Sequence, residues 1–546
     1  MPKVIYVKVI TIDAELDFTV QPNSSAQQVF NQVMKNLGLR ETWYFGLQYV
    51  DNKGQKTWLK LKKKFEAHKF HKDPYTSTDQ EPMQFKLLAK FYPEDVSEEL
   101  IQEVTQRMFF VQVKEAVLND DIYCPPEYSV MLASLAVQAR YGNYNSDVHT
   151  EGCLANERLL PQRVVDQHNM SKEDWEKRVI TLWGGHTDLM REEAMMKYLA
   201  MAQDLDMYGV NYFDIKNKKG TQLWFGVDAM GVNIYEKEDK LSPRIGFPWS
   251  EIRKISFNDK KFCIKPLDKK NHGKNINLYA SRMRINKRIL ALCVGNHELY
   301  MRRRQKDSVE VTQMKIQAKE EMLAKQAERA QLKKEKAARE DAERQRRELE
   351  EKLKQFENQV ELARKDLEKS QLAAVEFEQR LKEAEAERLA IQEAQAKAEE
   401  ARRLAEEAAS KEREERERLE AEAREAQMEL ERRMREAQER EEEARRLQQQ
   451  AEADEEDDEE DGAEFDVDEE ISSEDERMTQ QDKDRELQDQ LKALSDALAA
   501  SKDQSCMTQN DLLHEDNVSK GRNKYKTLKQ IRSGNTKYRI DMFEAM

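Results

Sequence analysis

The sequence is 546 residues long with a net charge of −15, and the charge is unevenly spread: residues 1–300 carry 42 Lys+Arg against 39 Asp+Glu, whereas residues 301–546 carry 50 against 68. The 5 cysteines are scattered without a CxxC pair, which excludes a dense disulfide framework and favours a reduced intracellular setting. No run of about 18 apolar residues occurs, and the charged, alternating opening is unlike a signal peptide, so we expect any membrane role to be peripheral.

Residues 1–90 are expected to form a ubiquitin-like lobe. Residues 4–20 are rich in β-branched side chains and are interrupted near the middle, which indicates a hairpin. Ser24 or Ser25 is the expected cap of the helix that follows, and a second hairpin is expected to turn at residues 52–54. Hairpin, helix and hairpin in this order are typical of ubiquitin-like folds.

Residues 91–207 change to a helical pattern. Ile101, Val104 and Met108 recur at helical spacing and therefore share one face. The run Ser171-Lys-Glu-Asp174 has the spacing of a capping box, so a helix is expected to begin there. We expect a small helical lobe.

Residues 208–304 alternate short β-rich runs with turn signals and end in one helical segment. Six or seven short strands closed by a helix are the layout of a sandwich of the pleckstrin-homology or phosphotyrosine-binding type. Residues 211–300 hold 18 basic against 9 acidic side chains, so this lobe is expected to carry a basic surface.

Residues 305–450 are expected to form an α-helical coiled coil, because residues 296–461 contain neither Gly nor Pro. A heptad register through residues 353–391 places ten apolar side chains on one seam. These are Leu353, Phe356, Val360, Ala363, Leu367, Ala374, Phe377, Leu381, Ala384 and Ile391. Such a seam requires a partner helix, and the sequence does not decide between a hairpin within one chain and a dimer.

Residues 451–478 are expected to form an acidic linker, since residues 452–476 hold 17 acids and no base, a composition that is not expected to pack. Residues 479–546 form a C-terminal domain that begins with an amphipathic helix, marked by Leu487, Leu491, Leu494 and Leu498. The segment 518–540 then carries eight basic residues and no acidic one.

Several long segments resemble a FERM domain of the ezrin–radixin–moesin family: WYFGLQYVDNKGQKTWLKL, KFYPEDV, QVKEAVLNDDIYCPPE, GFPWSEIRKISFNDKKFCIKP, RINKRIL and GNHELYMRRR. The ending KYKTLKQIRSGNTKYRIDMFEAM resembles the C-terminal actin-binding end of the family. The resemblance covers nearly the whole chain, and it is more moesin-like because no proline-rich run precedes the C-terminal region. It departs at residues 68–81, which we interpret as a surface-loop insertion.

The resemblance implies a multidomain α+β protein. Its three FERM lobes would be ubiquitin-like, acyl-CoA-binding-protein-like and PH/PTB-like, followed by a coiled coil, an acidic linker and a C-terminal domain that masks the FERM domain. It further implies a linker between plasma-membrane proteins and cortical actin, located in the cytoplasm at the cell cortex, on the cytoplasmic face of the plasma membrane. Opening of the masked form would need phosphoinositide binding and phosphorylation of a C-terminal threonine. No cofactor and no metal are implied.

Lysines in three segments are candidates for binding phosphatidylinositol bisphosphate. Four lysines in residues 59–64 would be attracted to an anionic lipid surface, although an ordinary solvated charge run is the simpler interpretation by composition alone. The resemblance favours the lipid site and adds lysine pairs from the third lobe and one lysine from RINKR. The full set is Lys60, Lys62, Lys63, Lys64, Lys260, Lys261, Lys269, Lys270 and Lys287.

The third lobe is expected to hold a groove between an edge strand and its closing helix. The resemblance implies that juxtamembrane tails of adhesion or scaffold proteins bind there by adding a strand. The positions that match are Ile245, Ile252, Ile255, Phe257, Val294 and His297. The alternative is that these apolar residues belong to the core.

The basic ending is the candidate actin-binding segment, because actin filaments are acidic. Its residues are Lys524, Lys526, Lys529, Arg532, Lys537 and Arg539. Nucleic acid is the rival ligand of such a patch, but the adjacent acidic linker would repel phosphates. Thr527 lies among these residues and is the candidate switch, since a phosphate adds about −1.5 to −2 charges.

Two other classes of function remain as alternatives. A coiled-coil membrane adaptor or tether would bind no actin and would tolerate deletion of residues 520–546. An enzyme is disfavoured, because the sequence contains neither GxxxxGK[ST] nor HExxH, and because His149 and Cys153 have no third orienting group in view. The expected partners are therefore F-actin, membrane-protein tails, phosphatidylinositol bisphosphate, and the chain's own C-terminal domain or that of another copy.

Overall fold

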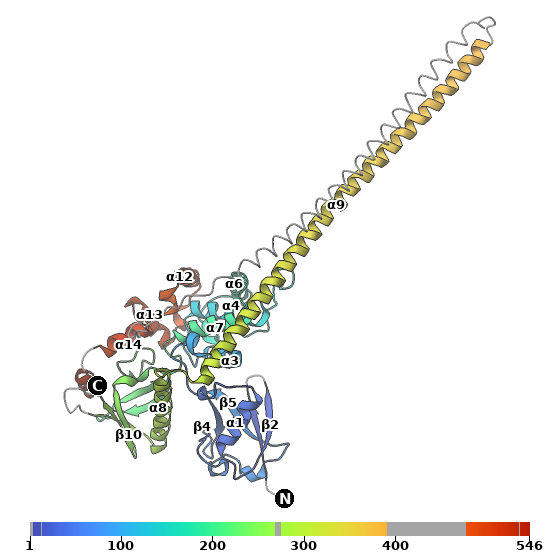
Figure 1. Cartoon of the computed structure of the whole chain (residues 1–546). Helices are drawn as coiled ribbons and strands as arrows, with labels where there is room; N and C mark the ends of the chain where they lie inside the picture. The colour runs from blue at the N-terminus through green and yellow to red at the C-terminus, as the bar shows by residue number, and fades with distance from the viewer. Residues whose placement is uncertain (1–3, 12–13, 268–274, 390–476, 534–535) are drawn as a thin grey trace, which may run out of the picture. The chain divides into compact units, whose positions relative to one another are not determined.

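The computed structural model describes most of the chain (Figure 1). The described residues are 4–11, 14–267, 275–389, 477–533 and 536–546, with side chains of the long helix described up to residue 373. The chain divides into two units. One unit joins residues 1–326 with 472–546, so the C-terminal segment packs with the N-terminal lobes, and the other contains residues 327–471.

The first lobe contains a five-stranded sheet with the strand order β2-β1-β5-β3-β4. Its elements are β1 (Ile5–Ile10), β2 (Glu15–Val20), α1 (Ala26–Asn36), η1 (Thr42–Tyr44), β3 (Phe45–Val50), β4 (Lys56–Trp58), η2 (Phe65–Ala67), η3 (Pro74–Thr76) and β5 (Met83–Ala89). Both expected hairpins are present, and β1 pairs in parallel with β5. Ser25 caps α1 through a capping box with Gln28.

The second lobe is helical. Its elements are α2 (Val96–Glu99), α3 (Glu103–Leu118), α4 (Pro126–Tyr141), α5 (Gln162–Asp166), α6 (Lys172–Gly184) and α7 (Arg191–Gln203). The expected capping box is confirmed, because the Ser171 hydroxyl accepts from the Asp174 backbone and Asp174 accepts from the Ser171 backbone. Trp183 is buried against α4 and donates its indole N–H to Gln138 over 2.9 Å.

The third lobe is a seven-stranded antiparallel sheet with the order β10-β11-β12-β6-β7-β8-β9, packed against α8 (Met283–Arg303). Its strands are β6 (Asn211–Lys216), β7 (Gln222–Asp228), β8 (Gly231–Glu236), β9 (Ile245–Pro248), β10 (Ile252–Asn258), β11 (Lys261–Pro266) and β12 (Ile276–Ala280), with η4 (Trp249–Glu251) between β9 and β10. Ile289, Leu292 and Cys293 attach α8 to the sheet core. The sandwich closed by one helix is therefore as expected.

A single long helix, α9 (Val309–Leu389), follows the third lobe. Seam residues Leu353, Phe356, Val360 and Leu367 lie on it and are 62%, 69%, 65% and 59% exposed. Ile391 lies outside the described residues, as do the side chains of the seam residues from Ala374 onward. The seam side chains that the structure describes are therefore exposed, and the hairpin and the dimer both stay predictions.

The C-terminal segment is helical and rests on the second and third lobes. Its elements are α11 (Gln480–Lys483), α12 (Arg485–Ala499), η6 (Gln504–Cys506), α13 (Gln509–Ser519), α14 (Lys524–Arg532) and α15 (Thr536–Ala545). The amphipathic helix expected from four leucines is α12, whose Leu491 and Leu498 are 2% and 3% exposed because they pack on the second lobe. Ile540 and Phe543 of α15 join the core of the third lobe.

Candidate functional site

The lysines of residues 60–64 stand on a loop whose backbone is held in place. Lys63 accepts from the Ala26 N–H at the start of α1 (2.9 Å), and the Lys60 N–H donates to the His68 ring (3.0 Å). Lys60, Lys62, Lys63 and Lys64 are nevertheless exposed. A rigid backbone with free ammonium groups suits an anionic surface, because little conformational entropy is lost on binding.

Helix α8 of the third lobe brings further positive charge to this loop. Arg284 of α8 pairs with Asp51 over 3.0 Å, and Arg288 donates to the Lys56 carbonyl over 2.9 Å, so the start of α8 lies against the β3–β4 turn. Burial, and then the charges of Lys63 and Lys287, lower the pKa of Lys60. Lys287 therefore faces the lysines of the first lobe across the junction.

The β10–β11 turn lies beside the same junction. The Asn286 side chain of α8 donates to the Asp259 carbonyl over 2.8 Å, and Lys260 and Lys261 follow in exposed positions. Lys269 and Lys270 lie outside the described residues. Lys60, Lys63 and Lys287 thus form a basic junction, which can attract a polyanionic head group.

The expected groove between β10 and α8 has edge-strand geometry. β10 is terminal in the strand order, and its Ile252, Ile255 and Phe257 are half-buried. On α8, Val294 is 47% exposed, and the half-buried His297 ring lies 6.0 Å from Trp249. An edge strand beside partly exposed apolar side chains can accept an added strand.

Ile245 does not belong to this groove, and its assignment is corrected. It lies on β9, at the opposite end of the strand order from β10, and is 1% exposed within the core. The sequence pattern could not make this distinction, because an isoleucine in the core and an isoleucine in a groove look alike in the sequence. The strand β9 instead contacts the C-terminal segment, since Arg539 donates to the Gly246 carbonyl over 2.9 Å.

One acid of the C-terminal segment docks into the second lobe. Asp511 of α13 is 4% exposed and accepts from Arg163 (2.6 Å), Gln167 (2.6 Å) and the Tyr123 hydroxyl (3.0 Å). Burial alone would raise the pKa of Asp511, but the hydrogen bonds from Thr508 and the charge of Arg163 lower it overall. Asp511 is therefore held as a carboxylate in a site made by the loop before α4 and by α5 with its C-cap Gln167.

Thr527 lies on the face of α14 that is turned toward the end of α7. It is 8% exposed and lines a pocket with Asp204 and Asp206. Burial raises the pKa of each of these two carboxyl groups to about 7. The neighbouring Lys524 donates its ammonium to the carbonyls of Gln203 (2.7 Å) and Leu205 (3.0 Å), so it caps the C-terminal end of α7.

The basic side chains of the C-terminal segment separate into two sets. Lys524 and Arg539 are buried at 9% and 3% exposure, and Arg539 also pairs with Glu251 over 2.6 Å. Arg532 is half-buried and donates to the Met230 carbonyl, whereas Lys526, Lys529 and Lys537 are exposed. In this form Lys524 and Arg539 are docking residues, so any contact of theirs with actin requires that the segment leave the lobes.

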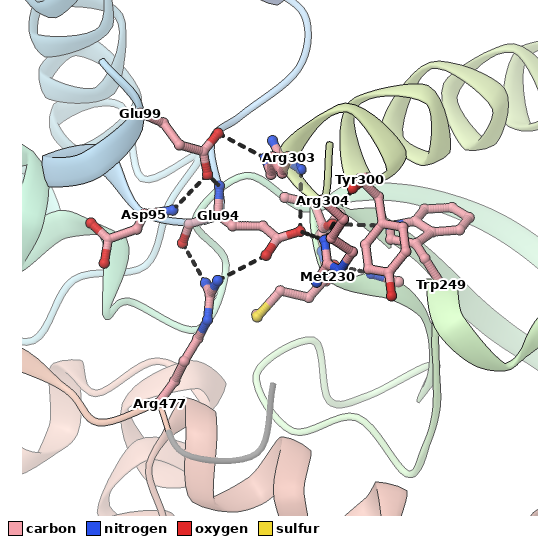
Figure 2. A network of polar contacts seen from close by, with 12 residues as sticks. Glu94, Asp95, Glu99, Met230, Trp249, Tyr300, Arg303, Arg304 and Arg477 are labelled. Carbon is pink, nitrogen blue, oxygen red and sulfur yellow. Dashed lines mark hydrogen bonds and ion pairs between the residues drawn. The ribbon is translucent and has the colours of Figure 1, made fainter. Parts of the chain in front are cut away.

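A polar network that sequence reasoning missed lies at the meeting point of the lobes (Figure 2). Glu94 lies between the first two lobes and is 8% exposed. It forms ion pairs with Arg303 (3.3 Å), Arg304 (3.2 Å) and Arg477 (2.8 Å). Glu94 and Arg477 are 383 positions apart, and Asp511 and Arg163 are 348 apart. Sequence spacing carries no signal for such pairs; the only hint was Arg477 as the first base after a run of acids.

His149 and Cys153 do not form a nucleophile–base pair. The His149 ring packs 4.6 Å from Trp183 and accepts from the Asn145 N–H over 3.1 Å. Burial, and then the neighbouring Glu176, raise the pKa of the Cys153 thiol. A reactive cysteine needs the opposite shift.

None of the described helices is long and apolar enough to cross a membrane.

Five family profiles match the chain in succession. They are the FERM N-terminal domain (residues 11–69), the FERM central domain (95–213), the FERM C-terminal PH-like domain (217–308), the ezrin/radixin/moesin alpha-helical domain (339–458) and the ezrin/radixin/moesin family C terminal (470–546). The matched regions follow the order of the lobes, the long helix and the C-terminal segment.

Similar proteins cover the whole length. The chain is 52% identical over 581 residues to Moesin/ezrin/radixin homolog 1 of Aedes aegypti, covering 99% of this chain and 98% of that protein. It is 54% identical over 579 residues to the protein of the same name in Culex quinquefasciatus, covering 99% and 100%. Among solved structures, the complex of the FERM and C-terminal domains of Drosophila Merlin is similar, with 49% identity and a TM-score of 0.52, covering 55% of this chain and 97% of that one.

Proposed function

The chain belongs to the ezrin–radixin–moesin family, and from this premise we propose that it is a regulated linker between the plasma membrane and cortical actin. The resemblance to this family is confirmed, and so is the fold class: three FERM lobes, a long helical region and a C-terminal domain. The proposed location is the cytoplasmic face of the plasma membrane at the cell cortex. The family consists of linker proteins, so membership in it does not support an enzymatic function.

The observation that carries the proposal is the burial of the C-terminal segment on the lobes of its own chain. Thr527 is 8% exposed, and the docking residues Lys524, Asp511 and Arg539 are buried beside second- and third-lobe groups. The similar structure of Drosophila Merlin is itself a complex of a FERM domain with a C-terminal domain. We therefore interpret the arrangement as a closed form in which the segment masks the FERM domain and withholds its own basic residues.

Two surfaces of the lobes are the proposed membrane contacts. The basic junction would bind phosphatidylinositol bisphosphate, with each lysine contributing about 1 kcal/mol at an anionic surface. The groove between β10 and α8 would bind cytoplasmic tails of adhesion or scaffold proteins by strand addition. Nucleic acid remains the disfavoured ligand of the basic tail, because the acidic linker next to it repels phosphates.

Phosphorylation of Thr527 is the proposed release signal. A phosphate adds about −1.5 to −2 charges to a threonine side chain. Here it would enter an enclosed pocket that already holds Asp204 and Asp206, so it would be both desolvated and repelled. The added charge therefore opposes docking of α14 and favours the open form.

Co-sedimentation of the full chain with F-actin tests the proposal. We expect little of the unmodified chain to sediment, and more of the Thr527→Asp chain, with a further increase when vesicles contain phosphatidylinositol bisphosphate. A chain with Ser519→Asp, on the exposed side of the same segment, is the matched control. The proposal fails if neither Thr527→Asp nor the lipid increases sedimentation.

The alternative is a membrane adaptor or tether that binds no actin. Deleting residues 520–546 separates the two, since the linker would lose all actin association and the tether would lose nothing.

A further inference from the structure

Arg477 is the first described residue after the acidic run of residues 452–476, and its side chain lies where the three lobes meet. Its guanidinium donates to the Glu94 backbone carbonyl (2.5 Å) and pairs with the Glu94 carboxylate (2.8 Å). Three residues further on, the Gln480 N–H donates to the Asp204 carboxylate. The C-terminal segment therefore begins at a defined point on the lobes.

Glu94 is shared between Arg477 and the end of α8 (Figure 2). Arg303 and Arg304 approach one carboxylate oxygen, and Arg477 approaches the other. Arg303 also pairs with Glu99 over 2.7 Å, and Glu99 accepts from the Tyr44 hydroxyl of the first lobe over 3.0 Å. One network thus joins the first lobe, the segment before α2, the third lobe and the C-terminal segment.

The charges of this network balance without Arg477. Glu94 and Glu99 then face Arg303 and Arg304, two carboxylates against two guanidiniums. Breaking a buried ion pair is strongly destabilising mainly because one charge stays behind uncompensated. Here the departing Arg477 is 28% exposed and Glu94 keeps two partners, so the penalty does not arise.

The same point of attachment is linked to the helix that carries Thr527. The Gln203 amide donates both to the Glu94 carbonyl (3.1 Å) and to the Tyr525 hydroxyl (3.3 Å), and the Gln203 carbonyl accepts from Lys524 (2.7 Å). Tyr525 and Lys524 stand two and three residues before Thr527 on α14. The Glu94 carbonyl thus accepts from both Arg477 and Gln203, and Gln203 in turn holds Tyr525 and Lys524 of the helix with the switch residue.

We propose that Arg477 is a releasable latch, which ties the C-terminal segment to Glu94 and, through Gln203, stabilises the docking of the Thr527 helix. Its release loosens α11, α12 and α14 while the three lobes remain joined by Arg303 and Arg304. The inference deepens the proposed function, because it names where the closed form is fastened.

Hydrogen exchange of the full chain, followed peptide by peptide, tests the latch. Arg477→Gln is expected to speed exchange in residues 480–499 and 524–532 about tenfold, the size of effect given by loss of one charge-assisted contact. Exchange in α8 is expected to stay at the wild-type rate. Arg485→Gln, an exposed arginine of the same segment, is the matched control and is expected to change nothing.

Two further variants separate the parts of the inference. Gln203→Leu is expected to speed exchange in residues 524–532 more than in residues 480–483, and Glu94→Gln is expected to loosen both the segment and α8. Equal exchange in Arg477→Gln and Arg485→Gln, or loosening of α8 by Arg477→Gln, would overturn the latch. If the wild-type segment already exchanges like an unfolded peptide, the closed form and the proposed function fail instead.

Discussion

At the scale of the residue, neighbouring basic side chains of one short helix have opposite roles. Lys524 is buried on α14 and donates to two carbonyls at the end of α7, whereas Lys526 is exposed and pairs with Asp482 over 3.3 Å. The two lysines are two positions apart and therefore point to different sides of the helix. Identical chemistry thus serves docking in one case and remains at the surface in the other.

Replacing Lys524 by methionine tests this division. Lys524→Met removes two charge-assisted hydrogen bonds, so we expect the docking of α14 to weaken by about 2 kcal/mol. Native-state hydrogen exchange of residues 524–532 at low urea concentrations measures the loss. Lys526→Met, which removes only a surface ion pair, is expected to change docking by less than about 0.5 kcal/mol. Equal effects of the two substitutions would contradict the assignment.

Asp204 and Asp206 make the closed form sensitive to pH. Burial raises the pKa of each to about 7, whereas the ordinary value is 3.8. The closed form holds these two protons more tightly than an open form would. It is therefore most stable below pH 3.8, the ordinary pKa, and this stability is lost as pH rises through about 7. Asp204 is faced by Lys524, Lys483 and Asp482, and Asp206 by Lys524 and Asp239.

We therefore expect the C-terminal segment to dock less tightly at about pH 8 than at about pH 6. Hydrogen exchange of α14, corrected for the intrinsic pH dependence, measures the change. The double variant Asp204→Asn with Asp206→Asn is expected to flatten it. His514 does not account for the effect, because burial lowers its pKa to about 4. A slope that survives in the double variant would refute this assignment.

At the scale of the element, α13 depends on one buried acid for its position. Asp511 caps its own helix through Thr508 and reaches three groups of the second lobe. Arg163 is held in turn by Asp120 over 3.0 Å, so the acceptor site is already formed by the lobe itself. The second lobe thus presents a positioned arginine, and α13 inserts a carboxylate beside it.

Replacing Asp511 by alanine is expected to weaken the docking of α13 by about 2–4 kcal/mol, because the buried contact with Arg163 is lost. The loss is not larger because Arg163 keeps Asp120 as a partner. Protease cleavage within residues 509–519, measured on the full chain, should become about 30-fold faster or more. Asp516→Ala is the control, since Asp516 only pairs with Lys520 on the exposed side of the same helix. Similar cleavage of the two variants would exclude an anchoring role.

At the scale of the whole molecule, the basic junction exists only because two lobes meet. Lys60 and Lys63 come from the first lobe, and Lys287 comes from α8 of the third. Arg284 and Arg288 of the same helix hold the lobes together at this point. The like charges are thereby kept close at some electrostatic cost, which a polyanionic ligand relieves.

Neutralising Lys60, Lys63 and Lys287 to asparagine is expected to remove about 3 kcal/mol of binding to vesicles that contain phosphatidylinositol bisphosphate, roughly a hundredfold in affinity. Vesicle co-sedimentation measures this. Neutralising the exposed Lys172, Lys177 and Lys197 of the second lobe removes the same net charge and serves as the control. If both triple variants lose the same affinity, net charge rather than the junction determines binding.

The local order of elements followed from the sequence by itself. Runs of β-branched residues and turn signals predicted the hairpins, a capping box predicted the start of α6, and the absence of Gly and Pro predicted the long helix. The signals are short-ranged, because backbone propensity and side-chain period act over a few residues. The segments shared with the FERM and ezrin–radixin–moesin patterns supplied the family, the fold class and the function to be tested.

Only the tertiary structure decided which residues meet. It placed Ile245 in the core, turned Lys524 and Arg539 inward, and paired Glu94 with Arg477 and Asp511 with Arg163. Burial and ion pairing depend on neighbours that lie hundreds of positions away, so composition and spacing carry no record of them. The sequence determined what the parts of this protein are, and the packing of the C-terminal segment on the lobes decided which of their charged groups are available.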